Sequence, residues 1–163
     1  MMRSHSALMS LSLLLSLGST SAAIASGKIY YGSRVGMTVT VISTLGLDTA
    51  NAVIRTKHTQ DDAVTFCREY VGKITQECVR RELETRLNDF VAANCLTGEF
   101  TDFYGKHYRF LGPNKNKNDD SEAKYRIQDA SSGEIANGSS ASGYGTNLEI
   151  YKALCPRHAP IDE

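Results

Sequence analysis

The segment of this chain closest in composition to a catalytic loop covers residues 138–143, which read G-S-S-A-S-G. Ser139 or Ser142 could serve as a nucleophile, and the small residues leave backbone amides open to an anion near the start of a helix. A nucleophile elbow, however, has the pattern G-x-S-x-G, and position 142 is serine where that pattern requires glycine. A tight loop that leads into a helix therefore explains this composition better than a catalytic site.

A serine nucleophile also needs a histidine as base and a carboxylate that orients the histidine. His58, His107 and Asp102 are the side chains that could complete such a triad with Ser142. Surface histidines and an aspartate in a turn explain the same residues, and all three groups must converge in space for catalysis. We therefore assign no catalytic residue, and a small serine hydrolase that uses residues 138–143 is the alternative function.

The cysteines indicate disulfides rather than a metal site. Cys67, Cys78, Cys95 and Cys155 are even in number, and none of them forms a close pair such as C-x-x-C. Close pairs are typical of structural zinc sites, whereas an even number of cysteines in an exported chain is typical of disulfides. We expect two disulfides, no metal ion and no cofactor.

Residues 1–25 have the layout of a secretory signal peptide. A basic start precedes an apolar run at residues 7–17, and small residues follow, with cleavage expected after Ala25 or alternatively after Ala23. The apolar run is shorter than the roughly 20 residues that span a bilayer. We therefore expect export to the periplasm or beyond, without stable membrane insertion of the mature chain.

The mature chain is close to neutral. Cleavage removes one arginine and no acidic residue, so 17 basic side chains remain against 18 acidic ones. This balance predicts neither a nucleic-acid partner nor an anionic membrane surface as partner. Its length suits one globular domain over residues 26–163, with a flexible polar loop at 112–121 and a frayed tail at 157–163.

Several segments have the alternation or the β-branched composition of strands. After a short apolar start at 28–31, the expected strands are 37–43, 52–57, 99–103, 106–111, 124–128 and 134–136. The first two are separated by a short turn and form a hairpin. Asp102 and Gly105 occupy the first and last positions of a type I turn between the third and fourth.

A helical hairpin is expected after the first two strands. Thr59, with Asp62 three residues later, matches the capping box at the start of a helix, and Gly72 ends that helix. Thr75 is expected to begin a longer helix that continues to Cys95. Its expected apolar stripe consists of Ile74, Cys78, Leu83, Leu87, Phe90 and Val91.

The hairpin selects one pairing of the cysteines. Cys67 and Cys78 lie at similar distances from the turn between the helices, so they can face each other. Cys95 and Cys155 then form the second disulfide by elimination.

A third helix is expected near the C-terminus, where Thr146 and Glu149 repeat the capping pattern and the apolar positions continue to Leu154. The coarse order is two strands, two helices, four strands and a helix. This order predicts an α+β fold in which a helical hairpin and a short C-terminal helix pack on antiparallel β-hairpins, with two disulfides.

The aromatic residues of the hairpin at 99–111 are expected to pack inward, as alternating aromatics on paired strands usually do. Tyr104 is the exception, because it lies at the tip of the turn. Tyr104 and the neighbouring Lys106 are therefore the candidate contacts for a partner.

Four stretches carry a resemblance to a known group of proteins. N-C-L-T-G-E-F-T-D-F-Y-G-K-H-Y-R-F, K-Y-R-I-Q-D and S-S-A-S-G-Y, followed by N-L-E-I-Y-K-A-L-C-P, look like small exported proteins of unknown function from rhizobia and related alphaproteobacteria. The resemblance covers roughly the last 70 residues and implies a Gram-negative periplasm, but no mechanism. Together these features predict a non-enzymatic binding or envelope-associated module whose partner is a protein or an envelope component.

Overall fold

The computed structural model describes residues 27–115 and 123–159. The expected signal peptide, most of the polar loop and the end of the C-terminal tail lie outside the described residues. The centre of the fold is a curled antiparallel sheet of seven strands that follow one another in chain order. They are β1 (Lys28–Tyr30), β2 (Thr38–Leu45), β3 (Ala52–Lys57), β4 (Phe90–Asn94), β5 (Glu99–Thr101), β6 (His107–Pro113) and β7 (Tyr125–Asp129).

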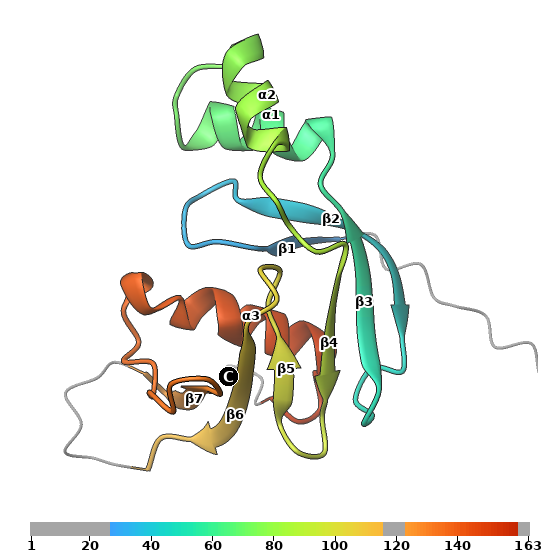
Figure 1. The fold of residues 1–163 in the computed structure, drawn as a ribbon, viewed down its shortest axis with the longest axis vertical. Helices are drawn as coiled ribbons and strands as arrows, with labels where there is room; N and C mark the ends of the chain where they lie inside the picture. The colour runs from blue at the N-terminus through green and yellow to red at the C-terminus, as the bar shows by residue number, and fades with distance from the viewer. Residues whose placement is uncertain (1–26, 116–122, 160–163) are drawn as a thin grey trace, which may run out of the picture.

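Helices lie at two places on this sheet (Figure 1). The C-terminal helix α3 (Tyr144–Leu154) packs across one face, where it contacts β1, β3, β4 and β7. The hairpin of α1 (Gln60–Glu69) and α2 (Gln76–Leu83) is inserted between β3 and β4 and lies beyond β1 and β2, at the top of Figure 1. The expected α+β architecture is therefore confirmed.

The core lies between α3 and the sheet. Tyr151 of α3 is fully buried, and its ring stacks on that of Phe110 with 4.4 Å between the ring centroids. The Phe100 ring is tilted against it, with 5.4 Å between the centroids. Aliphatic side chains from both layers surround these rings, among them Ile29, Val39, Ile54, Val91, Ile127, Ile150 and Leu154. The predicted inward packing of the hairpin aromatics is confirmed by Phe100 and Phe103, which are both buried.

The prediction of a long helix from Thr75 to Cys95 is wrong. Helix α2 ends at Leu83, and the segment that was expected to complete the helix forms β4 instead. Strand β4 pairs with β3 on one side, where Val91 lies opposite Ile54, and with β5 on the other. Val91 is fully buried, whereas Phe90 and Leu83 are exposed, so the expected apolar stripe is divided between two elements. Pairing on both edges satisfies the backbone of β4 and outweighs its local helical spacing.

Two smaller expectations are also corrected. Helix α3 begins at Tyr144, and its N-cap is Gly143, three residues earlier than the expected N-cap Thr146. Gly143 has a φ of +70°, a backbone conformation that glycine adopts without strain. The strand expected at 134–136 is reduced to a single bridge between Ile135 and Gln128.

Both expected disulfides are present. Cys67–Cys78 joins α1 to α2, with 6.1 Å between the Cα atoms. Cys95–Cys155 joins the end of β4 to the end of α3, with 5.6 Å between the Cα atoms. One disulfide therefore closes the helical hairpin, and the other attaches the covering helix to the sheet.

Candidate functional site

The residues of the hypothetical serine triad lie on separate elements. Ser139 and Ser142 precede α3, and the Ser142 hydroxyl donates a 2.7 Å hydrogen bond to the carbonyl of Ser139. Ser142 also lines a cavity of about 140 Å³ that contains Tyr108 and Lys106 but no histidine among its described lining residues. His107 lies at the start of β6, and His58 lies between β3 and α1.

Asp102 serves the turn in which it lies. Its Oδ1 accepts hydrogen bonds from the backbone amides of Tyr104 at 2.8 Å and Lys106 at 2.9 Å, and its carbonyl accepts one from Gly105. The expected turn is therefore present, and Tyr104 at its tip is 51% exposed. Burial of part of the phenol, together with the carboxylates of Asp102 and Glu82, raises the pKa of Tyr104.

A polar cluster that the sequence did not indicate consists of Tyr31, His58 and Glu82. Tyr31 directly follows β1, His58 directly follows β3, and Glu82 belongs to α2. The Tyr31 hydroxyl donates to a carboxylate oxygen of Glu82, whose side chain is buried. The His58 ring lies edge-on to the Tyr31 ring, with 5.4 Å between centroids. The His58 Nε2 atom lies 3.8 Å from the Glu82 oxygen, too far for a hydrogen bond, and neither ring nitrogen has a hydrogen-bond partner among the described residues.

Burial decides the protonation of His58 and Tyr31. It lowers the pKa of His58, although the carboxylates of Glu82 and Asp62 oppose that effect. Burial and the bond to Glu82 raise the pKa of Tyr31, which keeps its proton as a donor. At neutral pH the cluster therefore holds a neutral imidazole beside the tyrosine and the glutamate.

The lowered pKa predicts that stability falls in mild acid. Unfolded His58 titrates near 6.5 and binds protons more readily than folded His58, so stability is lost as the pH falls through 6.5 towards the folded pKa. His58→Phe keeps the ring contact with Tyr31 and removes the titration. We expect its free energy of unfolding, measured by urea denaturation at pH 7.5 and pH 5, to fall less than that of the unsubstituted protein. An equal fall in both proteins would contradict the assignment to His58.

A second buried carboxylate fixes α1 to the sheet. Asp62 is fully buried and accepts hydrogen bonds from the backbone amide and hydroxyl of Thr59, which confirms the predicted capping box. It also accepts from the Thr40 hydroxyl of β2 and forms an ion pair with Lys28 of β1 at 2.9 Å. Burial alone would raise the pKa of Asp62, but these donors outweigh burial and hold the pKa below its ordinary value.

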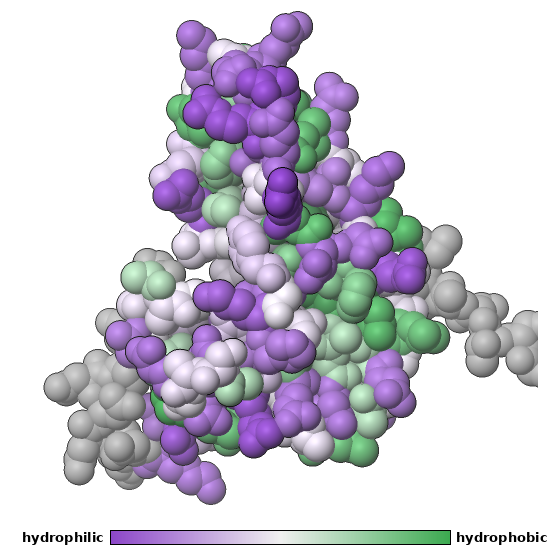
Figure 2. Space-filling model, viewed as in Figure 1, coloured by the Kyte–Doolittle hydropathy of each residue, from purple (hydrophilic) through white to green (hydrophobic). Residues whose placement is uncertain are grey.

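The outer surface of the helical hairpin carries an apolar groove. Its cavity of about 530 Å³ lies between α1 and α2 and is lined by Val64, Ile74, Val79 and Leu83, together with Gln60, Thr75, Gln76 and Arg80. Ile74 is 52% exposed and Leu83 is 41% exposed. Figure 2 shows hydrophobic atoms on both flanks of the hairpin, where they interrupt a mostly hydrophilic surface.

Two other kinds of site are not found in the part of the chain that the structure describes. Within residues 27–115 and 123–159, no three histidine, cysteine, aspartate or glutamate side chains gather to hold a metal ion. None of the helices in these residues has the length and hydrophobicity to cross a membrane. No protein-family model matches the chain, and searches of curated proteins and of solved structures found no similar protein.

Proposed function

We propose that this protein is a non-enzymatic binding module of the periplasm or the extracellular space, and that it docks a partner protein through the apolar groove on α1 and α2. The observation that carries the proposal is the exposure of Ile74 and Leu83 in a groove of about 530 Å³. Apolar groups gathered in an exposed groove are typical of interaction sites.

The buried residues of the hairpin lie outside this groove. They are Asp62, Ala63 and Cys67 of α1 and Glu82 of α2, and none of them lines the groove. The Cys67–Cys78 disulfide joins its two helices covalently. The hairpin is therefore held by a cross-link and by buried residues outside the groove, while the exposed side chains of Ile74 and Leu83 stay available to another molecule.

The lining of the groove favours an apolar and uncharged segment of the partner. Three of its polar residues are the neutral Gln60, Thr75 and Gln76. The one charged residue in the lining is Arg80, whose guanidinium donates 2.7 Å hydrogen bonds to Glu77 and to Glu84. Because this positive charge is already matched, a charged partner segment gains no ion pair there and loses hydration.

The disulfides support an oxidising compartment, and the sequence supports the periplasm in particular. Both disulfides are formed, and paired cysteines of this kind are typical of proteins that fold in an oxidising compartment. The expected signal peptide and the resemblance to exported alphaproteobacterial proteins support the periplasm as this compartment.

Site-specific photo-cross-linking in intact cells tests the proposal. A benzophenone amino acid is placed at Val79 in the groove or, as the control, at Arg81, whose side chain is 74% exposed outside the groove. We expect a discrete heterologous adduct from position 79 only. The partner identified from this adduct is then purified without the cross-link. It should bind the Ile74→Asp variant about 30-fold more weakly than the unsubstituted protein, which corresponds to losing about 2 kcal/mol at a buried contact.

Three results would contradict the proposal. Adducts of the same mass from positions 79 and 81 would indicate unspecific contact, and an adduct formed only with a second copy of the chain would replace the partner by self-association. Labelling of Ser139 or Ser142 by a fluorophosphonate probe would instead support the serine hydrolase. Circular dichroism of Ile74→Asp controls for folding, because this exposed substitution is expected to leave the fold intact.

A further inference from the structure

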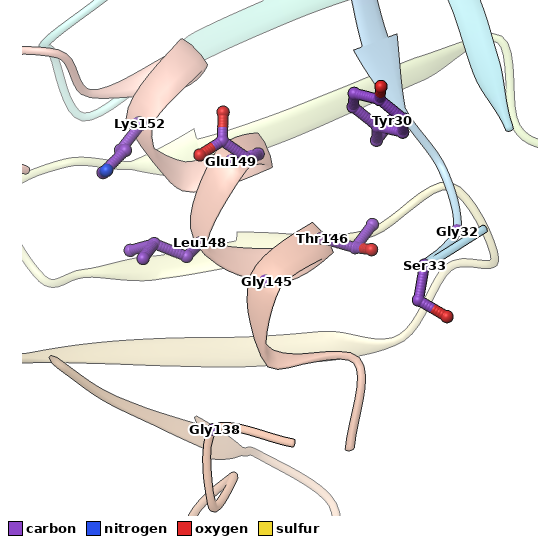
Figure 3. Close-up of a pocket in the computed structure, with 9 residues that line it drawn as sticks. All are labelled: Tyr30, Gly32, Ser33, Gly138, Gly145, Thr146, Leu148, Glu149 and Lys152. Carbon is purple, nitrogen blue, oxygen red and sulfur yellow. The ribbon is translucent and has the colours of Figure 1, made fainter. Parts of the chain in front are cut away.

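A second groove runs along α3, on the side that faces β1 and the loop that follows β1 (Figure 3). Its cavity of about 430 Å³ lies within the size range of pockets that bind small molecules. It is lined by Tyr30, Gly32, Ser33, Gly138, Gly145, Thr146, Leu148, Glu149 and Lys152. This groove is separate from the one on the helical hairpin, since the two share no lining residue.

The two walls of the groove offer complementary groups. One wall carries the ring of Tyr30, which is 43% exposed, and the hydroxyl of Ser33. The other wall is α3, which carries the Thr146 hydroxyl and the Glu149 carboxylate (Figure 3). An aromatic surface therefore lies in the same groove as hydroxyl groups, which both donate and accept hydrogen bonds, and a carboxylate, which accepts them.

Neither packing nor backbone conformation requires a glycine at position 145 in this groove. Gly138 is different, because a Cβ there would come within 2.9 Å of the backbone of Ala123 and its φ is +85°, whereas a Cβ at Gly32 would meet the flexible end of the Met37 side chain. A Cβ at Gly145 would meet no atom within 4 Å, and its backbone is not in the left-handed region. Alanine is the better helix former. Gly145 lowers the helix propensity of α3 and leaves the groove open.

We propose that this groove binds a saccharide. A sugar presents C–H groups that pack on an aromatic ring, and hydroxyl groups that pair with the side chains of Ser33, Thr146 and Glu149. The lining carries one carboxylate, on Glu149, and one ammonium group, on Lys152, so its charge favours neither an anion such as phosphate nor a cation. The polar walls disfavour a purely apolar ligand, which would leave their polar groups desolvated and unpaired.

Titration by two-dimensional NMR tests this site directly. The oxidised protein, labelled with nitrogen-15, is titrated with three neutral trisaccharides: chitotriose, cellotriose and maltotriose. We expect at least one of them to shift the amide signals of Tyr30, Gly145 and Thr146 in a saturable manner. Gly145→Val, which fills the groove, is expected to weaken that binding at least about tenfold, as is Tyr30→Ala, which removes the ring.

Gly27→Val is the matched control, because a side chain at Gly27 also meets no atom within 4 Å, its backbone is also outside the left-handed region, and Gly27 does not line the groove. It should bind the trisaccharide as the unsubstituted protein does. The proposal is overturned if none of the three trisaccharides shifts these signals at millimolar concentration, if the shifts lie elsewhere, or if Gly145→Val and Tyr30→Ala both bind unchanged. If Gly145→Val loses the folded spectrum, the binding of Tyr30→Ala decides the test, because Tyr30 is exposed and its substitution is expected to keep the fold.

Discussion

Replacing Cys95 and Cys155 together by alanine is expected to lower the free energy of unfolding by about 4 kcal/mol, the chain-entropy value for a loop of about 60 residues. The disulfide joins residues 60 positions apart and attaches the end of α3 to the end of β4. Both sulfur-bearing side chains are buried, and α3 carries Tyr151 into the core. Without the cross-link the unfolded chain has more conformational freedom, so folding α3 onto the sheet loses more entropy.

Guanidinium chloride denaturation of the oxidised protein and of the double variant measures this loss. The matched control replaces Cys67 and Cys78, which are 11 positions apart and join two helices outside the main core. The smaller loop predicts about 3 kcal/mol, and much of this is expected as local opening of the hairpin. An unchanged midpoint in the Cys95 and Cys155 variant, or a larger shift in the control, would contradict the expected order.

The second large effect is expected at Asp62. Asp62→Ala removes a fully buried carboxylate together with its bonds to Thr59, Thr40 and Lys28, so it loses a helix cap and the connection from α1 to the sheet. The expected cost is about 3 kcal/mol, because the substitution leaves hydrogen-bond donors without their partner at a buried position. Thermal unfolding followed by circular dichroism measures this cost.

Asp61→Ala provides the control for Asp62→Ala, because it removes the neighbouring carboxylate, which also forms an ion pair with Lys28. The Asp61 side chain is 79% exposed, so solvent screens its ion pair and the expected loss is below about 1 kcal/mol. Hydrogen exchange should show faster exchange in α1 of Asp62→Ala and little change in Asp61→Ala. Similar losses in the two variants would show that burial of Asp62 has no special role.

The sequence predicted the features whose causes lie within a few residues of one another. The pair of Thr59 and Asp62 marked the start of α1, and the alternation in residues 52–57 marked β3 with its correct bounds. The turn at Asp102 followed from side-chain chemistry in the same way. These signals are readable because capping, alternation and turns depend on hydrogen bonds and burial along a short stretch of chain.

The error at β4 has the opposite cause. Phe90 and Val91 continue the helical spacing of α2, and nothing local to them records that β3 and β5 each present an edge to this segment. The same limit applies to the polar cluster, in which Tyr31 and Glu82 lie 51 positions apart. The capping partner of Asp62 was visible in the sequence, but the contact with Lys28 was not.

The sequence by itself determined the α+β class, the pairing of the four cysteines and the capped start of the helical hairpin, because each of these depends on residue type and on spacing along the chain. Only the tertiary structure decided that residues 90–94 form a central strand, that His58 is buried beside Tyr31 and Glu82, and where the two grooves lie. Those features arise from groups far apart in the chain, whose contacts exist only once the sheet has brought its strands and helices together.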